Sequence, residues 1–87
     1  MVVRFVLADR VVTYPAAQLK RWEHLLGDQE TLVIRTDRDE VVIEGRDLTP
    51  IRTALDIGRL CELRLNYSAK VGARPGPQIR RITIEGA

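Results

Sequence analysis

The sequence predicts an α+β fold, a two-layer sandwich in which a mainly antiparallel sheet of about five or six strands carries two helices on one face. Three observations predict it. Segments with apolar residues at every second position alternate with segments that repeat at every third or fourth position. Asp-Arg pairs at 9–10 and 37–38 fall between strand-like segments, as hairpin turns do. Pro and Gly bracket both helix-like segments, which gives the element order ββαββαββ.

The chain begins with a predicted hairpin. Apolar and polar residues alternate over 2–7, so that Val3, Phe5 and Leu7 share one face of a strand. Residues 11–13 then return the chain beside the first strand. We expect this shared face to contribute to the core.

A first helix is predicted over residues 15–27. Pro15 suits the first turn of a helix, because the N–H group that it lacks would have no partner there. Gly27 suits the residue after the helix, where a left-handed conformation is common. The apolar stripe at helical spacing consists of Leu19, Trp22, Leu25 and Leu26.

A second unit repeats this order. Residues 31–36 and 41–44 predict two strands joined by a polar turn. Thr49 as the N-cap, Pro50 in the first turn and Gly58 at the end predict a second helix. The match indicates an internal ββα repeat, although two units of the same topology would share these turn and helix-end residues without duplication.

A third hairpin completes the predicted sheet. Residues 60–67 alternate cleanly, and the loop over 66–78 is rich in Gly and Pro. In the closing strand, Ile79 is out of phase with Ile82. A bulge at residues 80–81 would return both side chains to the same face. With 87 residues and one core of this size, we expect a single domain over residues 1–87.

Composition narrows the class of protein. The net charge of +2 comes from 14 basic and 12 acidic residues, which is too balanced to demand an anionic partner. Arginine supplies 12 of the basic residues, as the GC-rich genomes of many bacteria would encode. A single cysteine favours a reducing compartment, and no apolar run approaches the roughly 18 residues of a membrane-spanning helix. We therefore expect a cytoplasmic protein that does not enter a membrane.

The titratable side chains do not predict an enzyme. His24 falls on the polar side of the first predicted helix, where we expect a solvated histidine without a catalytic partner. Cys61 falls on an apolar strand face, where we expect a small buried side chain rather than a nucleophile. Neither phosphate-loop spacing nor a set of metal ligands is present in the sequence. We expect no catalytic residue, metal, cofactor or small-molecule substrate.

The leading functional hypothesis is a non-enzymatic binding or assembly module that acts through protein–protein contacts and forms a homodimer. Alternation places valines and arginines together on the sheet face opposite the two predicted helices. Exposed valines on one face are typical of an interface, and burial in a dimer would add to a small core. The predicted interface consists of Val2, Arg4, Val6, Val33, Arg35 and Val42.

The alternative hypothesis is a small nucleic-acid-binding protein that uses the hairpin loop over residues 66–81. This segment carries four basic residues and no acidic residue. Basic side chains can grip a phosphate backbone, and a tyrosine can stack on a base. The residues assigned to this site are Tyr67, Lys70, Arg74, Arg80 and Arg81.

Overall fold

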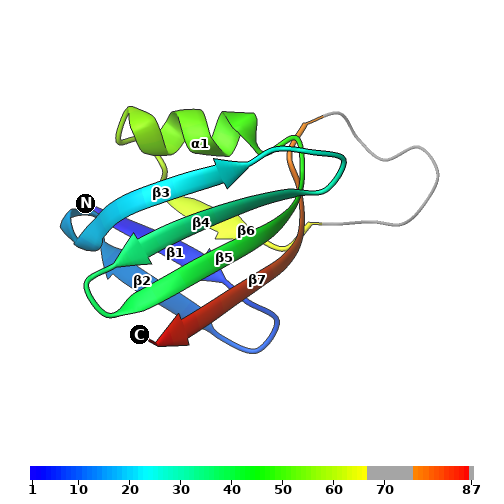
Figure 1. Cartoon of the computed structure of the whole chain (residues 1–87). Coiled ribbons are helices and arrows are strands. Elements are labelled where there is room, and N and C mark those ends of the chain that lie inside the picture. The colour runs from blue at the N-terminus through cyan, green and yellow to red at the C-terminus, as the bar shows by residue number, and fades with distance from the viewer. Residues whose placement is uncertain (67–75, 87) are drawn as a thin grey trace.

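The computed structural model describes residues 1–66 and 76–86 (Figure 1). Its elements follow in the order β1 (Val2–Val6), β2 (Val11–Pro15), a short 3-10 helix η1 (Ala16–Gln18), β3 (Leu19–Leu25), β4 (Glu30–Thr36), β5 (Asp39–Arg46), α1 (Thr49–Asp56), β6 (Glu62–Arg64) and β7 (Gln78–Gly86).

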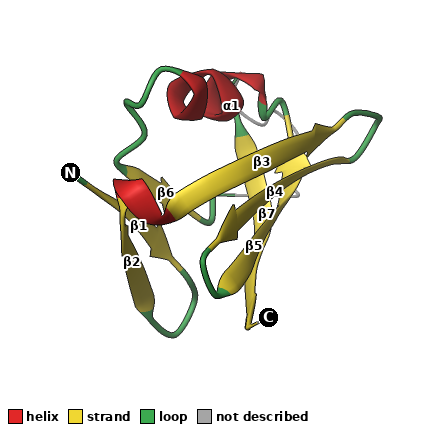
Figure 2. Ribbon diagram, turned by 60° about the vertical axis from the view of Figure 1, so that its left-hand side comes forward, coloured by secondary structure: helices red, strands yellow, loops and turns green. Residues whose placement is uncertain are grey.

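The strands form two sheets, which corrects the predicted single sheet with two helices on one face (Figure 2). One sheet has the order β2-β1-β6, in which β6 runs parallel to β1, and the other has the order β3-β4-β5-β7. The described residues contain one α-helix rather than two. The protein is therefore mostly β, because the segment expected to form the first helix is a strand.

The core lies between the inner faces of the two sheets, and α1 covers one side of it. Phe5 in β1 is fully buried, and its ring meets Tyr14 edge-on at 5.9 Å between centroids. The hydroxyl of Tyr14 donates a hydrogen bond of 2.6 Å to Asp39, so β2 is tied to the start of β5. The other buried hydrophobic residues are Val3, Leu32, Ile34, Val41, Ile43, Leu48, Ile51, Leu55, Leu60, Leu63, Ile79 and Ile82.

The predicted helix over 15–27 is wrong, and the reason is a β-bulge. The register between β3 and β4 shifts between Leu19 and Arg21, so β3 has one extra residue at that point. The bulge brings Leu19 and Trp22, three residues apart, to the same side of the strand. An apolar spacing of three therefore arises in a strand and imitates the period of a helix. Leu26, the end of the supposed stripe, is 76% exposed.

The second predicted helix is confirmed as α1, with Pro50 in its first turn. The predicted N-cap is wrong. Leu48, rather than Thr49, takes the N-cap position, and the Leu48 side chain makes no capping hydrogen bond. Because only the second of the two units contains an α-helix, the structure does not support an internal ββα repeat.

The final segment forms strands in two different sheets, so residues 60–85 are not the predicted hairpin. The bulge predicted at residues 80–81 is confirmed, because the register between β5 and β7 shifts beside Glu44. Ile79 and Ile82 are both buried as a result. Gly45 faces this bulge, and its Cα lies so close to β7 that a Cβ there would be 1.8 Å from the carbonyl oxygen of Gln78.

Candidate functional site

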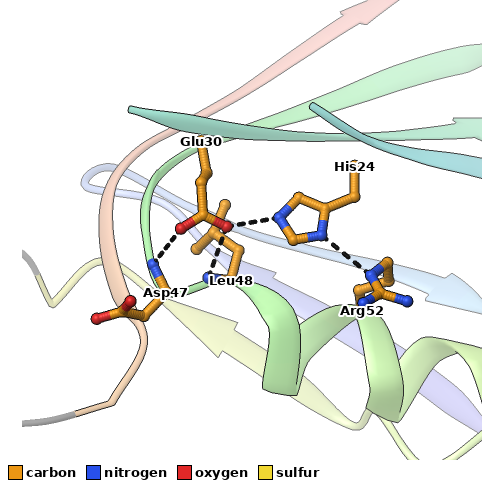
Figure 3. A network of polar contacts seen from close by, with 5 residues as sticks. All are labelled: His24, Glu30, Asp47, Leu48 and Arg52. Carbon is orange, nitrogen blue, oxygen red and sulfur yellow. Dashed lines mark hydrogen bonds and ion pairs between the residues drawn. The ribbon is translucent and has the colours of Figure 1, made fainter. Parts of the chain in front are cut away.

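The main polar cluster of the described residues links strands β3 and β4 to the N-terminal end of α1 (Figure 3). His24 in β3 and Glu30 in β4 are joined by a hydrogen bond of 2.6 Å between Nε2 and Oε1. The His24 side chain is 4% exposed and that of Glu30 is 14% exposed. The sequence-based expectation of a solvated histidine is therefore wrong, because a strand turns His24 toward α1 where a helix would have turned it to solvent.

The carboxylate of Glu30 closes the start of α1. It accepts the N–H of Asp47 at 2.6 Å and the N–H of Leu48 at 3.3 Å. Asp47 has a φ of 55°, a left-handed conformation that aspartate tolerates better than most residues. Burial acts to raise the pKa of Glu30, but the hydrogen bonds from His24 and from the two backbone N–H groups outweigh burial and hold that pKa below its ordinary value of 4.5.

This pKa shift predicts an acid-sensitive contribution of Glu30 to stability. A carboxyl whose folded-state pKa is lowered stabilises the fold above its unfolded pKa, near 4.5, and that contribution is lost as the pH falls through the lower folded value. We expect Glu30→Gln to lower the free energy of unfolding at neutral pH and to differ less from wild type at pH ~3. Urea unfolding at the two pH values measures this. An equal difference at both would contradict the assignment.

The second ring nitrogen of His24 fixes the tautomer. Arg52 in α1 donates its Nε–H to His24 Nδ1 over 3.0 Å, and an arginine Nε always carries a hydrogen. Nδ1 is therefore an acceptor, and the ring hydrogen sits on Nε2 and is donated to Glu30. His24 therefore bridges Glu30 and Arg52 through its two ring nitrogens.

The cluster continues along α1 to a tryptophan. Arg52 also contacts Asp56 at 3.4 Å, one helical turn further on. Asp56 in turn accepts the indole N–H of Trp22 at 2.8 Å. The side chains of His24 and Trp22 in β3 and of Arg52 and Asp56 in α1 thus form one polar seam. This seam holds the helix against the edge strand of the larger sheet.

The chemistry that this seam offers is structural rather than catalytic. A general base needs a nitrogen free to reach a substrate, and both nitrogens of His24 are engaged. Burial of the His24 ring further excludes a substrate from either position. Within residues 1–66 and 76–86, no three His, Cys, Asp or Glu side chains are grouped so as to hold a metal ion.

An apolar pocket lies beside the seam and shares Trp22 with it. The pocket is partly open to solvent and has a volume of about 110 Å³. Met1, at its edge, is 81% exposed, and Ile57, which precedes the lining residue Gly58, is 60% exposed. The lining residues come from the residue before β1, from β1, η1, β3 and α1, and from the segment after α1: Met1, Val3, Ala16, Leu19, Trp22, Leu55, Gly58 and Leu60.

The six residues of the predicted interface do not share one surface. Val2, Arg4 and Val6 belong to β1 in the three-stranded sheet, and Val33, Arg35 and Val42 belong to the four-stranded sheet. The two sheets face each other across the core, so their outer faces point in opposite directions. Each group forms a patch of its own: Val2, Arg4 and Val6 alternate along the outer face of β1, and Val33 and Val42 are direct partners in the register of β4 and β5.

The residues assigned to nucleic-acid binding are described only in part. Tyr67, Lys70 and Arg74 lie outside the described residues. Arg80 and Arg81 lie in β7, and both approach the carboxylate of Glu44, at 3.6 Å and 3.7 Å. One acidic side chain therefore offsets part of the charge that this hypothesis needs.

The prediction of a buried Cys61 is wrong, and the role of Glu30 was not predicted from the sequence. Cys61 is exposed, outside β6, and its thiol lies 3.5 Å from the carbonyl of Arg59. Glu30 directly precedes a predicted strand, and nothing in its neighbours marks it as a buried acceptor. The available signal was Trp22 and His24 two residues apart, which places both on one face only if the segment is a strand.

Comparison of this chain with protein-family models, with curated proteins and with solved structures finds no match. In the described part of the chain, α1 is too short to cross a membrane, and no other helix is long and apolar enough to do so.

Proposed function

We propose that the protein is a small non-enzymatic binding module that acts through protein–protein contacts, and that the pocket between β1, β3 and α1 receives one aliphatic side chain of a partner protein. The observation that carries this proposal is the pocket itself, with Trp22 on its wall and Met1 exposed at its edge. Large side chains anchored in apolar pockets dominate the energy of many protein interfaces.

The size of the pocket favours a side chain over a metabolite. Sites for drug-sized molecules and cofactors typically measure ~300–1,000 Å³, whereas this pocket measures about 110 Å³. A cavity of about 150 Å³ holds the six carbons of benzene, and this smaller pocket matches the four carbons of a leucine or isoleucine side chain. Its lining offers apolar contact and few hydrogen-bonding groups, as an aliphatic guest requires.

The surroundings of the pocket favour a protein surface as the source of that side chain. Met1 lines the pocket, is largely exposed, and would be covered by a partner wider than the guest group. The polar seam of Arg52 and Asp56 lies alongside, half-exposed, and offers hydrogen bonds at the rim. An apolar centre with a polar margin is the usual anatomy of a protein–protein interface.

Trp22, the sole tryptophan, reports directly on occupancy of the pocket. We expect N-acetyl-leucinamide to change the emission of Trp22 with saturation in the millimolar range, and N-acetyl-glycinamide to leave it unchanged. Ala16→Leu, which fills the pocket, abolishes the response. Ala17→Leu makes the same change at an exposed neighbour that does not line the pocket, and retains it. A response without saturation, or an equal one in both variants, would contradict the proposal.

A further inference from the structure

A second surface is the outer edge of β7, which pairs with no strand of the described residues. Among residues 1–66 and 76–86, β7 has β5 as its one strand neighbour, and Figure 1 shows it along the border of the larger sheet. The start of this edge is closed by Asn66, whose backbone N–H donates to the carbonyl of Ile79 and whose side chain accepts the N–H of Ile79. The stretch from Arg81 to Gly86 remains. An unpaired edge of this kind is a template for pairing with another strand.

One carboxylate on this stretch has no oppositely charged partner in the described part of the chain. Glu85 is exposed, has no cation partner among the described residues, and lies directly opposite Glu40 in the register of β5 and β7. Like charges directly opposite each other on neighbouring strands are destabilising. Arg81 has the complementary charge, is 67% exposed, and shares the carboxylate of Glu44 with Arg80.

We propose that β7 pairs antiparallel with β7 of a second copy of this chain, about a twofold axis at Thr83. In this register Arg81 of each copy lies opposite Glu85 of the other and gives Glu85 a cation partner. Ile82 lies opposite Ile84 on the inner face, and Thr83 lies opposite its own counterpart on the outer face. Opposite-charge, β-branched and threonine pairs are all favourable across strands, and the contact is isologous, as a twofold dimer requires.

The strand itself excludes the neighbouring registers. Directly opposed residues must lie on the same face of the sheet. The two neighbouring registers are therefore the ones whose twofold axis lies one residue away, at Ile84 or at Ile82. One of them places Glu85 opposite Thr83 and leaves both charges unpaired. The other centres the pairing on Ile82 and runs into the bulge beside Arg80 and the cap at Ile79. The register centred on Thr83 is the one that joins Arg81 to Glu85.

The dimer would extend the larger sheet across the axis. Val33, Val42 and Thr83 occupy one row of the outer face, since β4 pairs Val33 with Val42 and β5 pairs Val42 with Thr83. Pairing at Thr83 makes this row continuous between the copies. The homodimer expected from the sequence is thus formed through a strand edge rather than through a sheet face. This inference does not depend on the pocket, and occupancy of the pocket is measured separately.

Charge exchange tests the proposal. We expect sedimentation equilibrium of the wild-type chain to show a reversible monomer–dimer equilibrium. Arg81→Glu and Glu85→Arg each place like charges across the axis, and each weakens the dimer at least tenfold. An equimolar mixture of the two variants restores dimerisation as a heterodimer, because every opposed pair then combines a cation with a carboxylate.

Two controls make the result specific. Arg80→Glu changes the net charge as much as Arg81→Glu and lies beside the same Glu44, but faces no charged residue across the axis, so the dissociation constant stays within about twofold of wild type. Glu85→Arg relieves the repulsion with Glu40. We therefore expect this variant to dimerise more weakly than wild type without a lower urea unfolding midpoint. A wild-type chain that is monomeric at high micromolar concentration, a mixture that fails to dimerise, or an equal loss in Arg80→Glu overturns the proposal.

Discussion

Gly45→Ala is expected to destabilise the protein by about 3 kcal/mol, a large fraction of the stability of a domain this small. A Cβ at this position would lie 1.8 Å from the carbonyl oxygen and 2.9 Å from the carbonyl carbon of Gln78. Both atoms belong to the backbone of β7, so no side-chain rotation can make room. The strands must separate at the bulge, where Ile79 and Ile82 enter the core. Urea unfolding followed by circular dichroism measures the loss.

The matched control lies at the other end of the same strand pair. Gly86 is paired with Asp39, and a Cβ there would meet a single side-chain oxygen at 3.8 Å, an ordinary contact distance. Gly86→Ala is therefore expected to change the free energy of unfolding by less than about 0.5 kcal/mol. Equal effects at the two positions would show that glycine flexibility, rather than the close approach of β5 to β7, explains the result.

Glu30→Ala is expected to lower the free energy of unfolding by about 3 kcal/mol, because the Glu30 carboxylate accepts hydrogen bonds from three donors. Its removal leaves the Nε2–H of His24 without a partner in a side chain that is 4% exposed. It also frees the N–H groups of Asp47 and Leu48, which direct the chain into α1. A buried donor without an acceptor costs more than the hydrogen bond gained in forming the pair. Loss of helical signal and a lower urea midpoint are the expected readouts.

Glu23→Ala provides the comparison for Glu30→Ala. Glu23 lies in β3 next to His24, and its carboxylate pairs with Arg21 at 2.8 Å on the outer face. Both partners are more than 40% exposed, and an ion pair of this kind contributes under about 1 kcal/mol. If the two substitutions destabilised the protein equally, the contribution of Glu30 would come from its charge alone and not from the burial of its hydrogen bonds.

The roles of Gly45 and Glu30 both depend on residues that are distant in the sequence. Gly45 lies in β5, one residue beyond the strand predicted over 41–44, and its role depends on the backbone of residue 78. The bulge beside it could be predicted, because Ile79 and Ile82 are out of phase and both apolar. Glu30 could not be predicted, because its three partners are distributed over β3 and the turn before α1.

The amino-acid sequence by itself determined the local elements whose signals do not conflict. The hairpin turns at residues 9–10 and 37–38, the strands around them and the helix that begins near Pro50 all follow from short-range chemistry: alternation, turn residues and a proline in the first helical turn. These signals are confirmed because each one depends on residues close together in the chain.

The tertiary structure alone decided the fate of residues 19–25, the division into two sheets and the burial of His24. A bulged strand and a helix can place the same apolar residues on one side, so spacing could not choose between them. Pairing with β4 makes the choice, and it also turns His24 toward Glu30 and Arg52. Strand partners are set by side-chain packing between segments distant in sequence, and that information is not contained in any single segment.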